Sequence, residues 1–189
     1  MRKSGGQIRQ IAVVALMVLP ATTMAQTAEV SVMIRDGDPH DRIYIRNTGR
    51  CPLGYGVLGL DFTTSAGHIL IDTAYGGAGT KDPMPVEVES GPLSVHPVLD
   101  GDRQIVMDIE GLAQGQSGVV TLDVDNEASG WFASRVSILN DHLEGTEARF
   151  ASMSQDARGV FDATGTVIIG LPQDMCAPLE DAPSTVPMD

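Results

Sequence analysis

The stretch that decides the fold class of this chain covers residues 100–130, DGDRQIVMDIEGLAQGQSGVVTLDVDNEASG. Apolar side chains occupy every second position of residues 105–109, and they do so again in residues 120–124. This period of two is typical of β-strands with one buried and one solvent-facing side. Between the two runs, residues 111–116 contain two glycines, which favours a turn. The stretch therefore predicts a β-hairpin.

Folding the two arms together about the middle of this turn places acidic residues opposite one another. Asp102 falls opposite Asp125, and Asp100 falls opposite Glu127. Like charges directly opposite one another destabilise a strand pair. We therefore expect either that solvent separates these carboxylates or that a cation lies between them.

A calcium site is the leading hypothesis for this acidic end, because calcium binds about six to eight oxygens from carboxylates, carbonyls and water. The predicted ligands are Asp100, Asp102, Asp123, Asp125 and Glu127, and Asn126 could add an amide oxygen. Two other acidic clusters are further candidates, namely Asp36, Asp38 and Asp41, and Asp141, Glu144 and Glu147. None of these spacings matches an EF-hand loop, so solvated acidic turns are the alternative interpretation.

The rest of the chain predicts an all-β fold. Short alternating segments recur between turns rich in Gly, Asn and Asp, and no segment has sustained helical periodicity. This pattern predicts an antiparallel β-sandwich of immunoglobulin-like or jelly-roll type with about ten strands. Residues 55–62 and 68–72 are expected to pair, and the proline-punctuated segments 85–89 and 93–98 are expected at sheet edges.

We divide the chain into a secretory signal at residues 1–25, a single β-sandwich domain at 26–172, and an acidic, proline-rich tail at 173–189. The first segment has a basic start, a short apolar run and small residues before Ala25, where we expect cleavage. Nothing later is long and apolar enough to cross a bilayer. These features predict a secreted protein, extracellular or periplasmic.

The chain is strongly acidic, with 12 basic and 25 acidic residues and a net charge of −13. Removal of residues 1–25 takes away three basic residues and no acidic one, so the net charge becomes −16. Such a surface repels nucleic acid and anionic membranes. It suits cations or a basic partner, although a merely solvating acidic coat is the simpler interpretation.

Two cysteines, Cys51 and Cys176, follow the signal. In an oxidising compartment an even pair most simply predicts one disulfide, which would tether the tail at Cys176. Zinc is the weaker alternative, because no second cysteine or histidine lies at ligand spacing from either sulfur.

Two other functions have weaker support in the sequence. Leu-Ile-Asp72-Thr-Ala, with an apolar-apolar-Gly segment at 167–170, is similar to the retropepsin aspartic proteases, but Ala74 stands where that motif requires glycine. An aspartic-type hydrolase centred on Asp72 is therefore one alternative. A glycan-binding module is another, because an exposed Trp131 could stack on a sugar or contact a partner, whereas a buried Trp131 would be core packing.

Several segments resemble the small secreted proteins of marine bacteria known as aggregation factor core proteins, which are similar to one domain of the sponge aggregation factors. The resemblance rests on residues 42–54, 67–79, Asp100-Gly-Asp102 and Leu122-Asp-Val-Asp125, and it extends over about residues 30–171. It implies an extracellular β-rich domain with a role in calcium-dependent adhesion or matrix assembly, and it supplies no catalytic residue. We therefore expect a non-enzymatic interaction or adhesion domain whose partner is an extracellular protein or polysaccharide.

Overall fold

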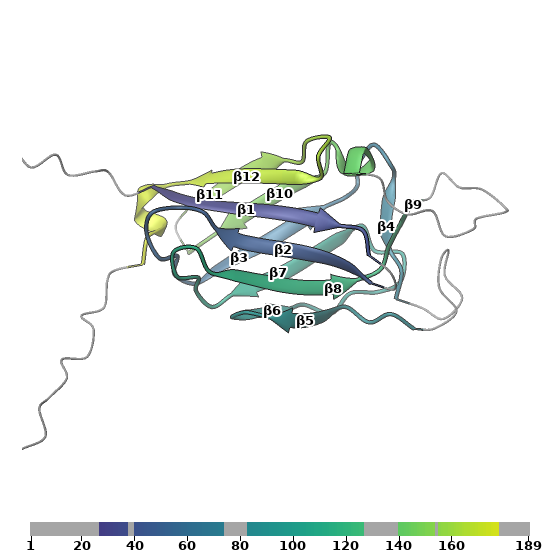
Figure 1. The fold of residues 1–189 in the computed structure, drawn as a ribbon, viewed down its shortest axis with the longest axis horizontal. Helices are drawn as coiled ribbons and strands as arrows, with labels where there is room; N and C mark the ends of the chain where they lie inside the picture. The colour runs from purple at the N-terminus through teal and green to yellow at the C-terminus, as the bar shows by residue number, and fades with distance from the viewer. Residues whose placement is uncertain (1–26, 38–39, 74–82, 127–139, 154, 178–189) are drawn as a thin grey trace, which may run out of the picture.

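The computed structural model describes residues 27–37, 40–73, 83–126, 140–153 and 155–177, and it shows two packed five-stranded sheets (Figure 1). The first sheet has the order β12 (Thr166–Leu171), β1 (Ala28–Arg35), β2 (Asp41–Asn47), β8 (Ser117–Leu122) and β5 (Glu87–Ser90). The second has the order β11 (Asp156–Val160), β10 (Glu147–Ala151), β3 (Gly56–Asp61), β7 (Gln104–Ile109) and β6 (Leu93–Val95).

A small third sheet pairs β4 (Ile69–Ile71) with β9 (Val124–Asn126), and two 3-10 helices cover Asn140–Leu143 and Gln173–Met175. All strand pairs in the described residues are antiparallel. The predicted all-β antiparallel sandwich is confirmed.

The core lies between the two large sheets and follows from the alternation in the sequence. In β1, Val30, Val32 and Ile34 are buried, while the residues between them are only partly covered. The inward side chains of both sheets join one buried cluster, to which β3 contributes Leu58 and Leu60. Burying each aliphatic side chain of this size contributes about 1.5 to 3 kcal/mol, so the repeated inward positions supply most of the driving force for folding.

The predicted central hairpin is wrong, although both of its arms are strands. β7 pairs with β3 and β6 in the second sheet, whereas β8 pairs with β2 and β5 in the first. The connection between them passes from one sheet to the other because Leu112 is buried in the core. Leu112 also exchanges two backbone hydrogen bonds with Leu53 at 2.8 and 3.1 Å. Alternation shows which side of a strand is buried, but it does not identify the strand that pairs with it.

The expected pairing of residues 55–62 with 68–72 is also wrong, because β3 pairs with β10 and β7 while β4 pairs with β9. The proline-punctuated strands β5 and β6 do lie at sheet edges, as predicted. Proline has no N–H to donate to a ladder, which restricts such segments to positions with one strand neighbour.

A disulfide joins Cys51 to Cys176 across 125 residues of sequence. Cys51 lies beside the start of β1, because the neighbouring Arg50 N–H donates to the Thr27 carbonyl at 2.7 Å, and Cys176 follows the end of β12. Leu53 forms isolated bridges with both Leu112 and Cys176, so the segment after β12 is tied to the same end by backbone contacts. The predicted disulfide is confirmed. Such a bond indicates an oxidising compartment, extracellular or periplasmic. Within the described ranges, no helix has the length and apolarity required to span a membrane.

Candidate metal centre

Three aspartates meet at the opposite end of the sandwich, where β4 and β9 pair (Figure 1). The ladder pairs Leu70 with Asp125 and Ile71 with Val124, and it continues as the Asp72 N–H donates to the Asp123 carbonyl at 2.9 Å. Asp72 therefore lies across from Asp123. Because side chains alternate along a strand, Asp123 and Asp125 share one face.

The register thus brings together the carboxylates of Asp72, Asp123 and Asp125. One carboxylate oxygen from each lies within 4.8 Å of the others. The three residues are 1%, 4% and 3% exposed, respectively, although aspartate is almost never so buried without a compensating interaction. We call this set the aspartate cluster.

The turn that contains Asp100 and Asp102 lies along the other edge of β4. The Ile71 N–H donates to the Asp102 carbonyl at 2.8 Å, and the Gly101 N–H donates to the Ile71 carbonyl at 2.8 Å. Gly101 has a φ of 81°, a left-handed conformation that this tight turn requires and that glycine adopts without strain. β4 therefore separates Asp102 from Asp125, and the predicted opposition of these two residues is wrong.

The predicted calcium ligands consequently have different positions. Asp123 and Asp125 belong to the aspartate cluster, and the Asp100 carboxylate accepts a hydrogen bond from the Thr73 N–H at 3.1 Å, next to Asp72. The Asp102 carboxylate accepts from the Leu99 N–H at 2.7 Å within its own turn. Glu127 and Trp131 lie outside the described residues.

Asp72 is the member of the cluster that the calcium hypothesis did not include. Sequence reasoning considered it only as a candidate catalytic residue, because nothing local relates residues 69–72 to residues 123–126. The available signal was an aspartate directly after one buried strand and an Asp-x-Asp after another. In that retropepsin comparison, residues 167–170 brace the catalytic loop, but here they lie in β12 and pair with β1.

Asp41 is a fourth buried carboxylate beside the cluster. Its Oδ2 accepts from the Val124 N–H at 2.9 Å, and its Oδ1 accepts from the Gly37 N–H at 3.1 Å. Burial raises the pKa of Asp41 to about 7, the two backbone hydrogen bonds oppose that rise, and the negative charges of Asp123 and Asp36 add to it. Asp41 thus joins the start of β2 to β9 between the two cluster residues Asp123 and Asp125.

The electrostatics of the cluster require compensation. Two like unit charges about 4 Å apart repel by roughly 4 kcal/mol at an effective dielectric constant near 20. Three carboxylates withdrawn from water at such separations are stabilised by protons, by hydrogen bonds or by positive charge, and a cation between them would supply positive charge to all three. Their donor set consists only of oxygen, which calcium and magnesium prefer, whereas structural zinc favours nitrogen and sulfur. Buried ligands favour calcium over magnesium, because magnesium gives up its water reluctantly.

The titration of Asp41 predicts a pH dependence that can be measured in chelator. Its folded-state pKa of about 7 lies above the ordinary 3.8, so its stabilising contribution is full below about pH 4 and is lost as pH rises through 7. Asp41→Asn cannot titrate and also loses one of the two hydrogen bonds. The wild type should therefore lose stability relative to this variant between pH 4 and 7, as measured by urea unfolding. A difference that stays constant with pH would contradict the assignment.

No protein-family model matches the chain, and no curated protein sequence is significantly similar to it.

Proposed function

We propose that this chain is a secreted, non-enzymatic β-sandwich that mediates extracellular interactions in a calcium-dependent manner. The observation that carries the proposal is the aspartate cluster, with three buried carboxylates within 4.8 Å at one end of the sandwich. The disulfide and the acidic composition agree with an oxidising exterior that contains divalent cations. The resemblance to aggregation factor core proteins supports adhesion as the purpose of the interaction.

In this proposal calcium has a structural effect that assists binding. An ion held by Asp72, Asp123 and Asp125 would join the end of β4 to β9, and Asp41 would extend that link to β2 through the Val124 N–H. This end of the sandwich would then become more rigid, which lowers the entropic cost of binding a partner. The partner is an extracellular protein or polysaccharide.

The test is a thermal melt of the purified protein in EDTA and in calcium. A ligand that binds only the folded state raises stability by about 2.7 kcal/mol at one hundred times its dissociation constant. For a chain of this size that corresponds to a melting point about 5 to 11 °C higher. Magnesium at the same concentration should shift the melting point less. An unchanged melting point over millimolar calcium would remove the metal from the proposal.

An aspartic-type hydrolase centred on Asp72 is the second candidate. It is favoured by the proximity of the Asp72 carboxyl to those of Asp123 and Asp125, since neighbouring carboxyls can share the proton that such catalysis needs. The wild type should then hydrolyse casein or cell-wall peptides at acid pH, and Asp72→Asn should abolish this activity. Absence of hydrolysis by the wild type would eliminate the candidate.

A further inference from the structure

The outer face of the second sheet has a hollow at its centre, at Gly59. The register places Gly59 between Arg149 of β10 and Val106 of β7, so two larger side chains flank a position that has none. A Cβ atom added to Gly59 would meet nothing within 4 Å. The hollow has a volume of about 280 Å³, and Arg149 and Arg158 line one of its sides.

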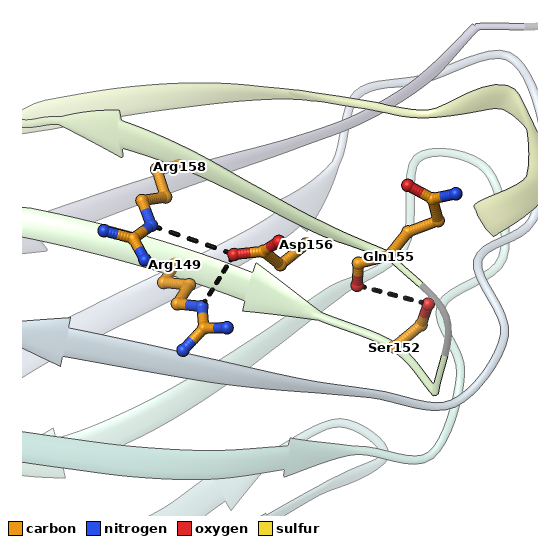
Figure 2. A network of polar contacts seen from close by, with 5 residues as sticks. All are labelled: Arg149, Ser152, Gln155, Asp156 and Arg158. Carbon is orange, nitrogen blue, oxygen red and sulfur yellow. Dashed lines mark hydrogen bonds and ion pairs between the residues drawn. The ribbon is translucent and has the colours of Figure 1, made fainter.

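The two arginines lie directly opposite each other in the β10–β11 hairpin. Like charges in this position destabilise a strand pair. Asp156 offsets the repulsion, because its Oδ2 lies 3.0 Å from the Arg149 Nε and 3.8 Å from the Arg158 Nε (Figure 2).

The terminal guanidinium nitrogens of both arginines are available to a ligand. Each ion pair with Asp156 uses the Nε atom, and Figure 2 shows the terminal nitrogens directed away from the aspartate. The two side chains are 55% and 63% exposed. The terminal N–H groups of a guanidinium match a carboxylate in bidentate geometry. The hollow therefore has two guanidinium groups on one side, each able to bind a carboxylate.

Hydrogen-bond acceptors line the same hollow at one end. The register places Glu147 opposite Asp61 and Asp61 opposite Gln104. These residues lie on the same face as Arg149 and Gly59, two positions further along their strands. The Gln104 Nε2 donates to the Asp61 Oδ2 at 2.9 Å, which orients both side chains. Carboxylate and amide oxygens in this row accept hydrogen bonds from hydroxyl groups.

Further along the face, a second polar network surrounds Asp108. The exposed Tyr55 donates through its hydroxyl to the Asp108 Oδ1 at 2.9 Å, and the His96 Nε2 lies 3.1 Å from the Asp108 Oδ2. An exposed aromatic ring held by a hydrogen bond is a common surface for sugar stacking.

We propose that this face binds an acidic sugar, a uronate unit of an extracellular polysaccharide, with the carboxylate on Arg149 and Arg158 and the ring over Gly59. A uronate matches both kinds of group, because its carboxylate can pair with the guanidinium groups and its hydroxyls can donate to the acceptors at Asp61 and Glu147. An acidic peptide would place further carboxylates beside Asp61 and Glu147 and would offer them no hydroxyl groups. The inference rests on the proposed extracellular role and specifies its partner, but it does not require the metal.

The experiment is calorimetric titration of the purified protein with an oligogalacturonate in EDTA, so that its outcome is independent of calcium. A neutral oligosaccharide of equal length and an oligoglutamate serve as comparison ligands. Gly59→Gln places a side chain in the hollow, and its Cβ would meet nothing within 4 Å. Arg149→Gln/Arg158→Gln removes both guanidinium groups. The matched controls are Gly170→Gln, where an added Cβ also meets nothing within 4 Å, and Arg46→Gln, which changes an exposed arginine of β2 in the other sheet.

The wild type and both controls should bind the oligogalacturonate in preference to either comparison ligand. Gly59→Gln should bind about tenfold more weakly or not at all because its side chain occupies the hollow, and the double arginine variant should do so because it loses charged hydrogen bonds. Unaltered melting points would show that these variants fold. Absent wild-type binding, equal affinity for a comparison ligand, or undiminished binding by Gly59→Gln would overturn the assignment, whatever calcium does to the melting point.

Discussion

Removing the Cys51–Cys176 disulfide should lower the free energy of unfolding by about 4 to 5 kcal/mol in the chain-entropy model. The bond closes a loop across 125 residues of sequence, so the unfolded chain gains much conformational freedom when it is broken. That loss is a large part of the total stability of a typical domain. Urea unfolding of Cys51→Ala/Cys176→Ala against the wild type measures it.

The wild type in a reducing agent is the matched control, because reduction breaks the bond without emptying the buried site of Cys51. The free energy of unfolding should fall by a similar amount in both forms, and slightly further in the alanine variant because its sulfur atoms are missing. Backbone contacts should still hold the final segment in part, since the Ala177 N–H donates to the Pro52 carbonyl at 2.7 Å. A loss below about 1 kcal/mol in both forms would contradict the chain-entropy account.

The second large effect is expected at Asp72, and its sign should depend on calcium. In EDTA, the Asp72 carboxyl must either stay charged beside Asp123 and Asp125 or take up a proton, and Asp72→Asn removes that cost, so the variant should be at least as stable as the wild type. In saturating calcium, the wild type should gain about 2.7 kcal/mol or more, whereas the variant should gain little because it lacks one ligand. Urea unfolding at neutral pH under both conditions measures the reversal.

Asp174→Asn is the matched control, because Asp174 is exposed at the other end of the sandwich and the substitution removes the same charge. It should respond to calcium as the wild type does. Asp123→Asn and Asp125→Asn should behave like Asp72→Asn. An Asp72→Asn variant that kept the full calcium response would place any calcium site elsewhere, and one that was destabilised in EDTA would show that repulsion does not dominate the cluster.

The strands could be predicted from the sequence because alternation is a local signal. Val30, Val32 and Ile34 identify β1 without reference to any other part of the chain, since a strand with one buried side needs an apolar residue at every second position. The edge positions of β5 and β6 were predictable for a similarly local reason, the missing N–H of proline. The disulfide was predictable because the chain has two cysteines and a start that predicts export.

The pairing of strands could not be predicted in the same way. The alternation of β7 and β8 is equally compatible with a hairpin and with membership of two sheets. The choice depends on the burial of Leu112 and its hydrogen bonds to Leu53, which lies far away in sequence. The members of the candidate site could not be predicted for the same reason, because the register between β4 and β9 decides which carboxylates meet.

By itself, then, the sequence determined the all-β class, the buried side of alternating strands such as β1 and the single possible disulfide, because each depends on residue type and short-range period. Only the tertiary structure decided that Asp72 joins Asp123 and Asp125 while Asp102 does not, and that Gly59 leaves a hollow beside two arginines. The physical reason is that register is a long-range property. Shifting one strand by a single residue preserves its alternation but moves every side chain to the other face.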